Sequence, residues 1–267
     1  MKKKAWNQIG IDTVGRQFAS SVTQSELSDY INELNEDPSV SGILVQLPLP
    51  DKIDTTAIWD TIRHSKDVDG IHRLNMAAMA RHEDPTFTPW TPKGIMWLIK
   101  SVCPNILGKK ATVIGRSNIV GMPIALLLQK EFATVTLWHA HTRNLKEEIA
   151  SADIVVSATG CPYLVKGDFI KPGAIVIDVG TQFIDDKSRK SGRRLVGDVD
   201  YKSVSKRAGF ITPVPGGVGP MTIAMLMDNI VLAWKKTNFS HIKELIEKME
   251  RDKYEAFTSS FSSYELE

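Results

Sequence analysis

Four short runs of apolar, mostly β-branched residues recur through the middle of the chain, and stretches with helical spacing separate most of them. Runs of this kind are typical of parallel strands that are buried on both faces. Their alternation with helices predicts a doubly wound, Rossmann-like α/β sheet. The predicted strands span residues 111–115, 134–138, 153–158 and 174–179, and the clearest intervening helices span 123–128 and 145–150.

A second, smaller α/β region precedes these runs. Residues 41–47 form a compact apolar run that stops at two prolines, which predicts a buried strand, and residues 25–34 predict a helix that Ser25 caps. Residues 94–102 predict a further helix. We therefore expect a nucleotide-type domain and a discontinuous catalytic domain with a cleft between them. The predicted bounds are 94–211 for the first, 1–93 with 212–238 for the second, and 239–267 for a tail that is helical and then disordered.

Charge, apolar run lengths and cysteine count exclude several classes of protein. Lys and Arg together number 33 against 31 Asp and Glu, so bulk charge gives no support for nucleic-acid binding. Since no apolar run approaches the roughly 18 residues of a membrane-spanning helix, we predict no membrane span. The 2 cysteines cannot form a disulfide framework or a zinc site alone, so no metal is expected. No signal peptide follows the basic start, which favours the cytoplasm, with mitochondria as the alternative.

A glycine-containing turn follows the first apolar run, where residues 113–123 read V-I-G-R-S-N-I-V-G-M-P. A strand that enters a glycine turn and then a helix start presents backbone N–H groups to a pyrophosphate. The spacing is G-x-S-x-x-x-G rather than G-x-G-x-x-G, so the motif alone is weak. An ordinary strand-to-helix turn that needs glycine is the competing interpretation.

The residues that follow the second apolar run, 134–138, indicate which coenzyme the chain binds. NAD sites commonly place an acidic residue there to hold the ribose 2′-hydroxyl, but the chain instead continues with His139, Ala140 and His141. Arg116 and Arg143 add positive charge nearby. A cationic, acid-free pocket suits a 2′-phosphate and favours NADP over NAD, although both histidines could be plain surface residues.

Three further motifs could contact a small ligand. Gln46 stands at the end of the predicted strand, where it either faces the cleft or satisfies local backbone groups. In the turn K-D-V-D-G, Asp67 can brace the backbone, while Asp69 is a candidate acceptor for a cyclic amidine or guanidine-like heterocycle. Residues 212–222 hold three prolines and three glycines ahead of an apolar helix, a density that turn chemistry alone does not readily explain.

Together these segments resemble the bifunctional methylenetetrahydrofolate dehydrogenase/methenyltetrahydrofolate cyclohydrolase family. Each motif is modest alone, but the set is specific because it follows the family's order and spacing from Lys2 to about Ala233. The matching segments are 42–50, 66–70, 115–123, 197–199 and 211–222. The resemblance implies oxidation of 5,10-methylenetetrahydrofolate with NADP, followed by hydrolysis to 10-formyltetrahydrofolate. It also implies a homodimer that binds tetrahydrofolate derivatives.

The resemblance further implies roles for individual residues. Lys2 corresponds to the catalytic lysine, Gln46 to the glutamine that tunes it, and Asp69 to the aspartate that binds the pterin ring. Positively charged methenyl-folate would push a nearby lysine toward its neutral form, which can relay a proton for water attack. The folate cleft would be lined by Val45, Leu47, Pro215, Gly216 and Gly219, and the coenzyme would be bound by Gly115, Arg116, Ser117, Ala140 and Thr181.

The sequence departs from the family pattern in three places. The family's first strand is missing, together with a folate-stacking tyrosine shortly before the catalytic lysine. Ala140 stands where NADP-using members usually have serine, and Thr181 replaces an isoleucine beside the nicotinamide. The missing strand and tyrosine leave a non-catalytic folate- or nucleotide-binding remnant as the alternative. Gln46, Asp69 and the Pro-Gly loop argue against a third interpretation, an amino-acid dehydrogenase on the same scaffold.

Overall fold

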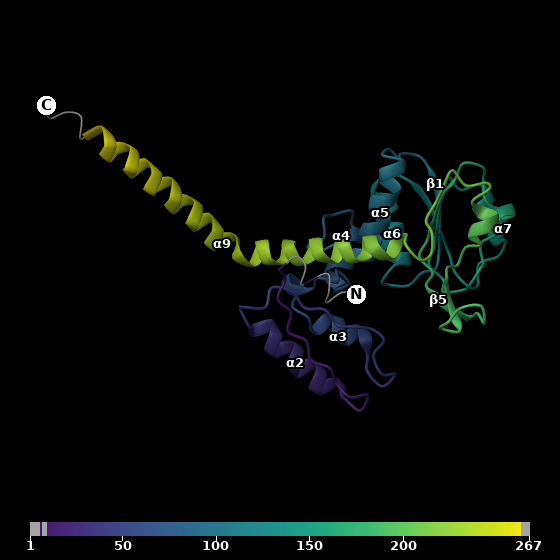
Figure 1. The fold of residues 1–267 in the computed structure, drawn as a ribbon, viewed down its shortest axis with the longest axis horizontal. Helices are drawn as coiled ribbons and strands as arrows, with labels where there is room; N and C mark the ends of the chain where they lie inside the picture. The colour runs from purple at the N-terminus through teal and green to yellow at the C-terminus, as the bar shows by residue number, and fades with distance from the viewer. Residues whose placement is uncertain (1–5, 7–9, 263–267) are drawn as a thin grey trace.

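A computed structural model describes Trp6 and residues 10–262 of the chain, without most side chains beyond residue 239. Its centre is a five-stranded sheet with the order β2-β1-β3-β4-β7, in which every neighbouring pair is parallel (Figure 1). The strands are β1 (Lys110–Ile114), β2 (Thr134–Trp138), β3 (Ile154–Ser157), β4 (Ile175–Asp178) and β7 (Phe210–Ile211). The predicted doubly wound sheet is confirmed, and the four predicted strands agree with the observed bounds to within a residue at each end.

Helices cover both faces of this sheet. Alternate residues of β3 point to opposite sides, so Ile154 and Val156 enter one apolar cluster while Val155 enters the other. The first cluster is closed by α5 (Trp90–Val102) and α6 (Gly121–Lys130). The second is closed by α7 (Leu145–Ala150), the 3-10 turn η2 (Gly167–Phe169) and α8 (Tyr201–Val204).

An antiparallel hairpin, which the apolar pattern did not predict, extends from the edge where β4 ends. It consists of β5 (Gln182–Asp185) and β6 (Arg193–Val196), with Gln182 opposite Val196. Half of its side chains are exposed, so it lacks the continuous apolar run that marks the parallel strands. The hairpin returns the chain to the end of β4, so residues 197–199 lie beside residues 178–180.

The N-terminal region contains α2 (Gln24–Glu36), α3 (Thr55–Thr61), the 3-10 turn η1 (His64–Lys66) and α4 (Arg73–Ala80). Ser25 does not cap α2 as predicted. Thr23 does, through a capping box with Glu26 in which each side chain accepts a backbone N–H of the other residue.

The predicted buried strand over residues 41–47 is also wrong. Within the described part of the chain only Ile43 pairs with another segment, through a parallel bridge to Asp67 in which the Ile43 N–H donates to Lys66 O at 2.7 Å. Gln46 is exposed and its neighbours are half-buried. An apolar run becomes a strand only where a second backbone lies alongside it, and in this structure the pairing stops after one residue.

The longest element is α9 (Val218–Ser262), which begins inside the Pro-Gly loop and continues through residues predicted to form a separate tail. Figure 1 shows it crossing the molecule, changing direction and extending beyond the other elements. Its first half packs along α5, and its Leu226 and Ala233 share an apolar cluster with Val68 and Phe87. No helix in the described part of the chain combines the length and apolarity needed to cross a membrane.

Candidate functional site

The carboxyl ends of the parallel strands meet at one edge of the sheet, where open α/β folds bind ligands. The register places Ile114 level with both Trp138 and Ser157, and Ser157 level with Asp178. The strand order reverses at β1, which has β2 on one side and β3 on the other. A dinucleotide crossing at this switch point would lie with one half over β1 and β2 and the other over β3 and β4.

The turn after β1 is packed too tightly for any residue but glycine at two positions. Gly115 has φ +109°, and a Cβ there would lie 2.2 Å from Ala158 O. A Cβ on Gly121, the first residue of α6, would lie 2.0 Å from Gly115 O. The two glycines therefore bring β1, α6 and the loop after β3 into direct backbone contact, which leaves a bare turn at a helix N-terminus.

Ser117 and Arg116 occupy this turn. The Ser117 hydroxyl accepts the N–H groups of Val120 at 3.3 Å and Gly121 at 3.4 Å, so it shapes the entry into α6. Arg116 is exposed. Its guanidinium is therefore available to a phosphate group at the edge of the sheet.

The end of β2 lies beside the same turn, because the Gly115 N–H donates to Trp138 O at 2.9 Å. The His139 and His141 rings stack edge-on with centroids 6.1 Å apart, and Ala140 between them is exposed. No acidic residue occupies positions 139–146. This side of the crevice thus has cationic and titratable groups and lacks the carboxylate that would hold a ribose 2′-hydroxyl.

The second half of the candidate site is the turn of residues 66–70. The buried Asp67 carboxylate accepts the backbone N–H groups of Gly70 at 3.1 Å and His72 at 2.8 Å, and the Asn75 amide at 2.9 Å. Burial raises the pKa of Asp67 despite these bonds. Asp67 therefore braces the turn, as predicted, and fixes the backbone that carries Asp69.

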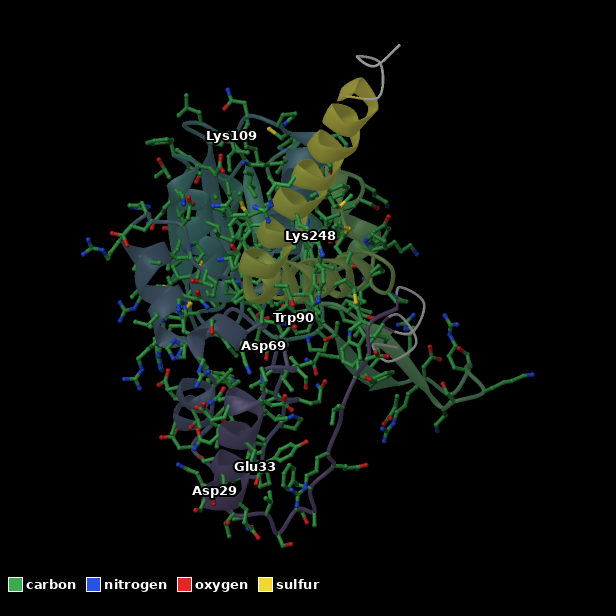
Figure 2. All side chains as sticks on the ribbon, turned by 90° about the vertical axis from the view of Figure 1, so that its left-hand side faces the viewer. Asp29, Glu33, Asp69, Trp90, Lys109 and Lys248 are labelled. Atoms are coloured by element: carbon green, nitrogen blue, oxygen red, sulfur yellow. The ribbon has the colours of Figure 1, made fainter. Side chains whose placement is uncertain are left out.

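Asp69 is itself buried, with 4% of its surface exposed. Figure 2 shows it near Trp90, at the level where the lobe of α2 and α3 meets α9. Gln46 is exposed, and its amide donates to Leu47 O at 3.1 Å. Because the Ile43–Asp67 bridge is parallel, both Gln46 and Asp69 leave it in the same direction.

The remaining predicted residues lie at exposed or half-buried positions. Val45 and Leu47 flank Gln46 and are half-buried, while Pro215 and Gly216 are exposed on the loop that leads into α9 and Gly219 is exposed in the first turn of that helix. Thr181 is exposed just after β4. Lys2 lies outside the described residues.

Asn229 is a polar residue that sequence reasoning missed. It is fully buried in α9, and its amide donates to Val68 O and to Thr88 O, both at 2.9 Å. Its Oδ1 accepts the Lys93 ammonium at 3.0 Å, and Lys93 also pairs with Asp228. α9 is therefore bonded directly to the turn that carries Asp69. The available signal was the Asp-Asn pair that interrupts an otherwise apolar helix.

Asp178 and Asp198 were also missed as functional candidates. Both are buried at the carboxyl edge of the sheet. Burial raises the pKa of Asp178 to about 6, in spite of three backbone N–H donors to its carboxylate, and the neighbouring Asp198 adds to the rise. The signal in the sequence is Asp178 itself, an acidic residue at the end of an otherwise apolar strand.

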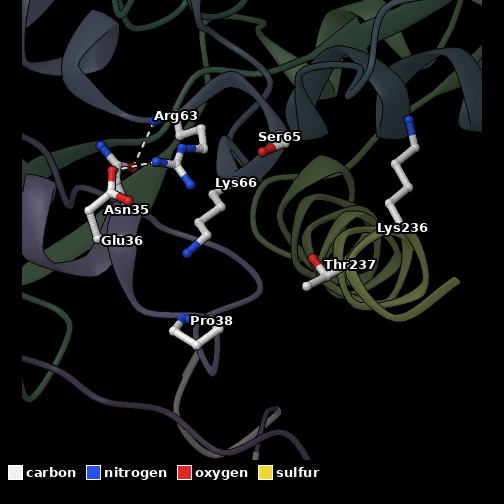
Figure 3. Close-up of a pocket in the computed structure, with 8 residues that line it drawn as sticks. All are labelled: Asn35, Glu36, Pro38, Arg63, Ser65, Lys66, Lys236 and Thr237. Atoms are coloured by element: carbon white, nitrogen blue, oxygen red, sulfur yellow. Dashed lines mark hydrogen bonds and ion pairs between the residues drawn. The ribbon is translucent and has the colours of Figure 1, made fainter. Parts of the chain in front are cut away.

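A pocket of about 340 Å³ lies elsewhere, between α2, η1 and α9 (Figure 3). The buried Lys66 ammonium donates there to Leu34 O at 2.9 Å and Asp37 O at 2.6 Å, and Arg63 pairs with Glu36. None of the predicted site residues lines this pocket. The described residues also contain no cluster of three or more His, Cys, Asp or Glu side chains that could hold a metal ion.

Two sequence models of known domains match the chain. Residues 1–69 match the tetrahydrofolate dehydrogenase/cyclohydrolase catalytic domain, and residues 89–238 match the NAD(P)-binding domain of the same description. The bifunctional protein FolD 2 of Arabidopsis thaliana is 51% identical over 231 residues, which cover 86% of this chain and 77% of that protein. The mitochondrial C-1-tetrahydrofolate synthase of Saccharomyces cerevisiae is 48% identical, but the match spans only 24% of its length.

Solved structures give the same result. The bifunctional FolD methylenetetrahydrofolate dehydrogenase/cyclohydrolase from Campylobacter jejuni superposes with a TM-score of 0.84 at 46% identity, covering 88% of this chain and 81% of that one. The Trypanosoma brucei enzyme, complexed with NADP cofactor and an inhibitor, also has a TM-score of 0.84, at 41% identity and with 88% and 80% coverage.

Proposed function

Because the chain belongs to the tetrahydrofolate dehydrogenase/cyclohydrolase family, we propose that it catalyses two successive one-carbon reactions. The first oxidises 5,10-methylenetetrahydrofolate to 5,10-methenyltetrahydrofolate with NADP, and the second hydrolyses that product to 10-formyltetrahydrofolate at the same folate site. The observation that carries the proposal is the glycine-built turn at the switch point of the sheet, where Gly115 and Gly121 leave no room for a side chain.

The residues at this turn fit a dinucleotide with a 2′-phosphate. Gly115 and Ser117 would hold the phosphates at the start of α6, and Arg116 would pair with the 2′-phosphate, since the end of β2 has no competing carboxylate. Ala140 adds no hydroxyl there, so we expect a modest preference for NADP, with NAD as the weaker alternative. When bound, NADP supplies the acceptor for the hydride. Thr181 would lie beside the nicotinamide.

On the folate side, Asp69 would accept hydrogen bonds from the pterin ring, a charge-assisted contact that fixes the orientation of the substrate. Val45, Leu47, Pro215, Gly216 and Gly219 would line the cleft around it. Hydride transfer needs little acid-base help and depends on holding the methylene carbon against the coenzyme. The rigid Asp67 brace beneath Asp69 supports such positioning.

Hydrolysis needs a proton acceptor for the attacking water, and we assign this role to Lys2, with Gln46 as the residue that tunes it. The assignment rests on the position of Lys2 in the family pattern. Cationic methenyl-folate disfavours a second positive charge nearby, which would lower the pKa of the lysine in the complex and make it a competent base.

The names of the relatives favour an enzyme over a non-catalytic remnant. We further propose that the protein is a homodimer. The exposed apolar side chains of Trp97 on α5 and of Val231 and Trp234 on the adjoining α9 support this assembly. Relatives are named as mitochondrial, chloroplastic and cytoplasmic forms, so the cytoplasmic location stays a prediction.

The proposal is tested by assaying the purified chain with 5,10-methylenetetrahydrofolate and either NADP or NAD, following reduced coenzyme and 10-formyltetrahydrofolate separately. We expect both products, with NADP preferred. Coenzyme binding without either product would favour the remnant, whereas oxidation of an unrelated substrate would favour a different dehydrogenase.

A further inference from the structure

Two buried carboxylates lie under the half of the crevice that extends beyond the switch point. Asp178 ends β4, and Asp198 follows β6, with 4% and 0% of their surfaces exposed. The β5–β6 hairpin brings them together, because Gln182 lies opposite Val196 and the chain continues from both into segments that meet. The hairpin therefore brings the two aspartates together, and the local sequence around either one does not predict the pair.

Residues 178–180 and residues 197–199 fit against each other only because each segment contains a glycine. The Asp178 carboxylate accepts the backbone N–H groups of Gly180 and Asp198, both at 2.9 Å, and of Val199 at 3.0 Å. A Cβ on Gly197 would lie 1.9 Å from Asp178 Oδ2, and a Cβ on Gly180 would lie 2.3 Å from Asp198 Oδ1. Each glycine thus leaves the space that the opposite aspartate fills.

Asp198 extends this arrangement to the neighbouring strand. Its Oδ2 accepts the Ser157 hydroxyl at 3.1 Å and the Thr159 N–H at 2.7 Å, while its buried Oδ1 has no hydrogen-bond partner among the residues that the structure describes. Ala158, between these two donors, is the residue whose carbonyl packs against Gly115. Asp198 therefore links the loops after β3 and β4 to the turn that would hold the coenzyme phosphates.

The pair lacks the cation that usually accompanies buried carboxylates. No lysine, arginine or histidine of the described chain lies within 4.0 Å of either carboxylate in an ion pair. Two adjacent buried acids are unfavourable for folding, and burial accordingly raises the pKa of Asp178 to about 6. Ionisable groups kept in such surroundings, at the ligand-binding edge of a sheet, are candidates for a functional role.

Resting on the proposed function, we infer that Asp198 is a positioning residue for the dehydrogenase reaction. Its carboxylate fixes the loop after β3 against the loop after β4, and these loops form the floor beneath the nicotinamide half of the coenzyme. Because the carboxylate is buried below the loops, it acts through them rather than by touching the coenzyme. Small displacements of a reacting group weaken transfer strongly, whereas hydrolysis of the methenyl compound uses no coenzyme and should not depend on this floor.

The test is Asp198→Asn, which preserves shape but replaces the charged acceptor of the Ser157 hydroxyl and the Thr159 N–H with a neutral amide oxygen. We expect NADPH binding, measured by fluorescence titration, to weaken about tenfold, because both bonds lose the extra strength that a charged acceptor gives. The turnover of methylenetetrahydrofolate oxidation should fall as well, while cyclohydrolase activity stays within about twofold of wild type. Asp200→Asn is the matched control, because Asp200 accepts only a local bond from the Ser203 hydroxyl at 2.7 Å. It should leave both activities and NADPH binding unchanged.

Ser157→Ala is the second variant, and it carries the test if Asp198→Asn does not fold. It removes one donor to Asp198 and keeps the charge, so we expect a threefold to tenfold loss of NADPH affinity, on the order of one hydrogen bond. Wild-type NADPH affinity in the folded variants, or an equal loss of both activities together with thermal stability, would overturn the inference. Failure of the wild-type chain to oxidise methylenetetrahydrofolate would instead refute the proposed function, and the NADPH titrations would still decide the role of Asp198.

Discussion

Replacing Asn229 with alanine should release α9 from the turn that carries Asp69. Asn229 is fully buried, and its amide supplies the N–H groups that the carbonyls of Val68 and Thr88 accept, each at 2.9 Å. These bonds join residues 161 and 141 positions apart in the chain. These hydrogen bonds therefore connect the C-terminal helix directly to the N-terminal region.

The expected loss of folding stability comes from the hydrogen-bonding groups that the substitution leaves unpaired. Alanine leaves the two carbonyls without their donor, and an unsatisfied buried polar group costs about 1–3 kcal/mol. Alanine also favours helix more than asparagine does, by about 0.5 kcal/mol, which offsets a small part of the loss. We expect a net destabilisation of about 2–5 kcal/mol, a large part of the roughly 5–15 kcal/mol that stabilises a typical domain.

Urea unfolding followed by tryptophan fluorescence measures this difference. The matched control is Asn238→Ala, since Asn238 lies on the same helix and its amide donates, within the described structure, only to Trp234 O, one turn earlier, at 2.9 Å. The control should change stability by about 0.5 kcal/mol or less, as surface substitutions do. If Asn229→Ala and Asn238→Ala lose the same amount, the bonds to Val68 and Thr88 do not hold α9 in place.

Three further variants test individual residues. Arg116→Ala should raise the KM for NADP about tenfold or more and that for NAD much less, because only NADP carries the 2′-phosphate; equal losses would mean that Arg116 only supports the turn. Burial raises the pKa of Asp178 to about 6 in the folded state, whereas the unfolded chain has an ordinary pKa near 3.9. Between these two pH values the folded state holds the proton and the unfolded chain has lost it. Stability should therefore fall by about 3 kcal/mol as pH rises from 4 to above 6. Asp178→Asn should flatten that slope in unfolding curves taken across this range, and an unchanged slope would contradict the assignment. Lys2→Met should lower cyclohydrolase activity by about 10²–10⁴-fold and spare part of the dehydrogenase, with Lys3→Met as the nearly silent control; full hydrolysis by Lys2→Met would remove Lys2 as the base.

The sheet could be predicted because its strands are recognisable locally. A parallel strand buried on both faces is a continuous apolar run, and β1 to β4 each have one. The run at residues 41–47 is also largely apolar, but in the described structure it pairs only at Ile43, since pairing depends on which backbone lies alongside. The Thr23–Glu26 capping box was readable in the sequence and identifies the start of α2 better than Ser25 does.

The candidate site also combines parts that the local sequence predicts with parts that it does not. The turn after β1 and the Asp67–Asp69 turn are local motifs, and both were found by spacing. The contacts that hold them were not, because Asn229 meets Val68 across 161 residues and Asp198 meets Ser157 across 41. Such pairs depend on how α9 packs against the N-terminal region and how the β5–β6 hairpin returns the chain to the end of β4.

One folate site, in which Asp69 orients the substrate, is proposed to serve both reactions. The most direct measurement compares wild type and Asp69→Asn for the KM of methylenetetrahydrofolate in oxidation, the KM of methenyltetrahydrofolate in hydrolysis, and the Kd of NADPH. A charge-assisted contact contributes about 1.5–3 kcal/mol, so both KM values should rise by about tenfold or more while NADPH binding is unchanged. A rise in only one KM, or in neither, would contradict a shared folate site at Asp69.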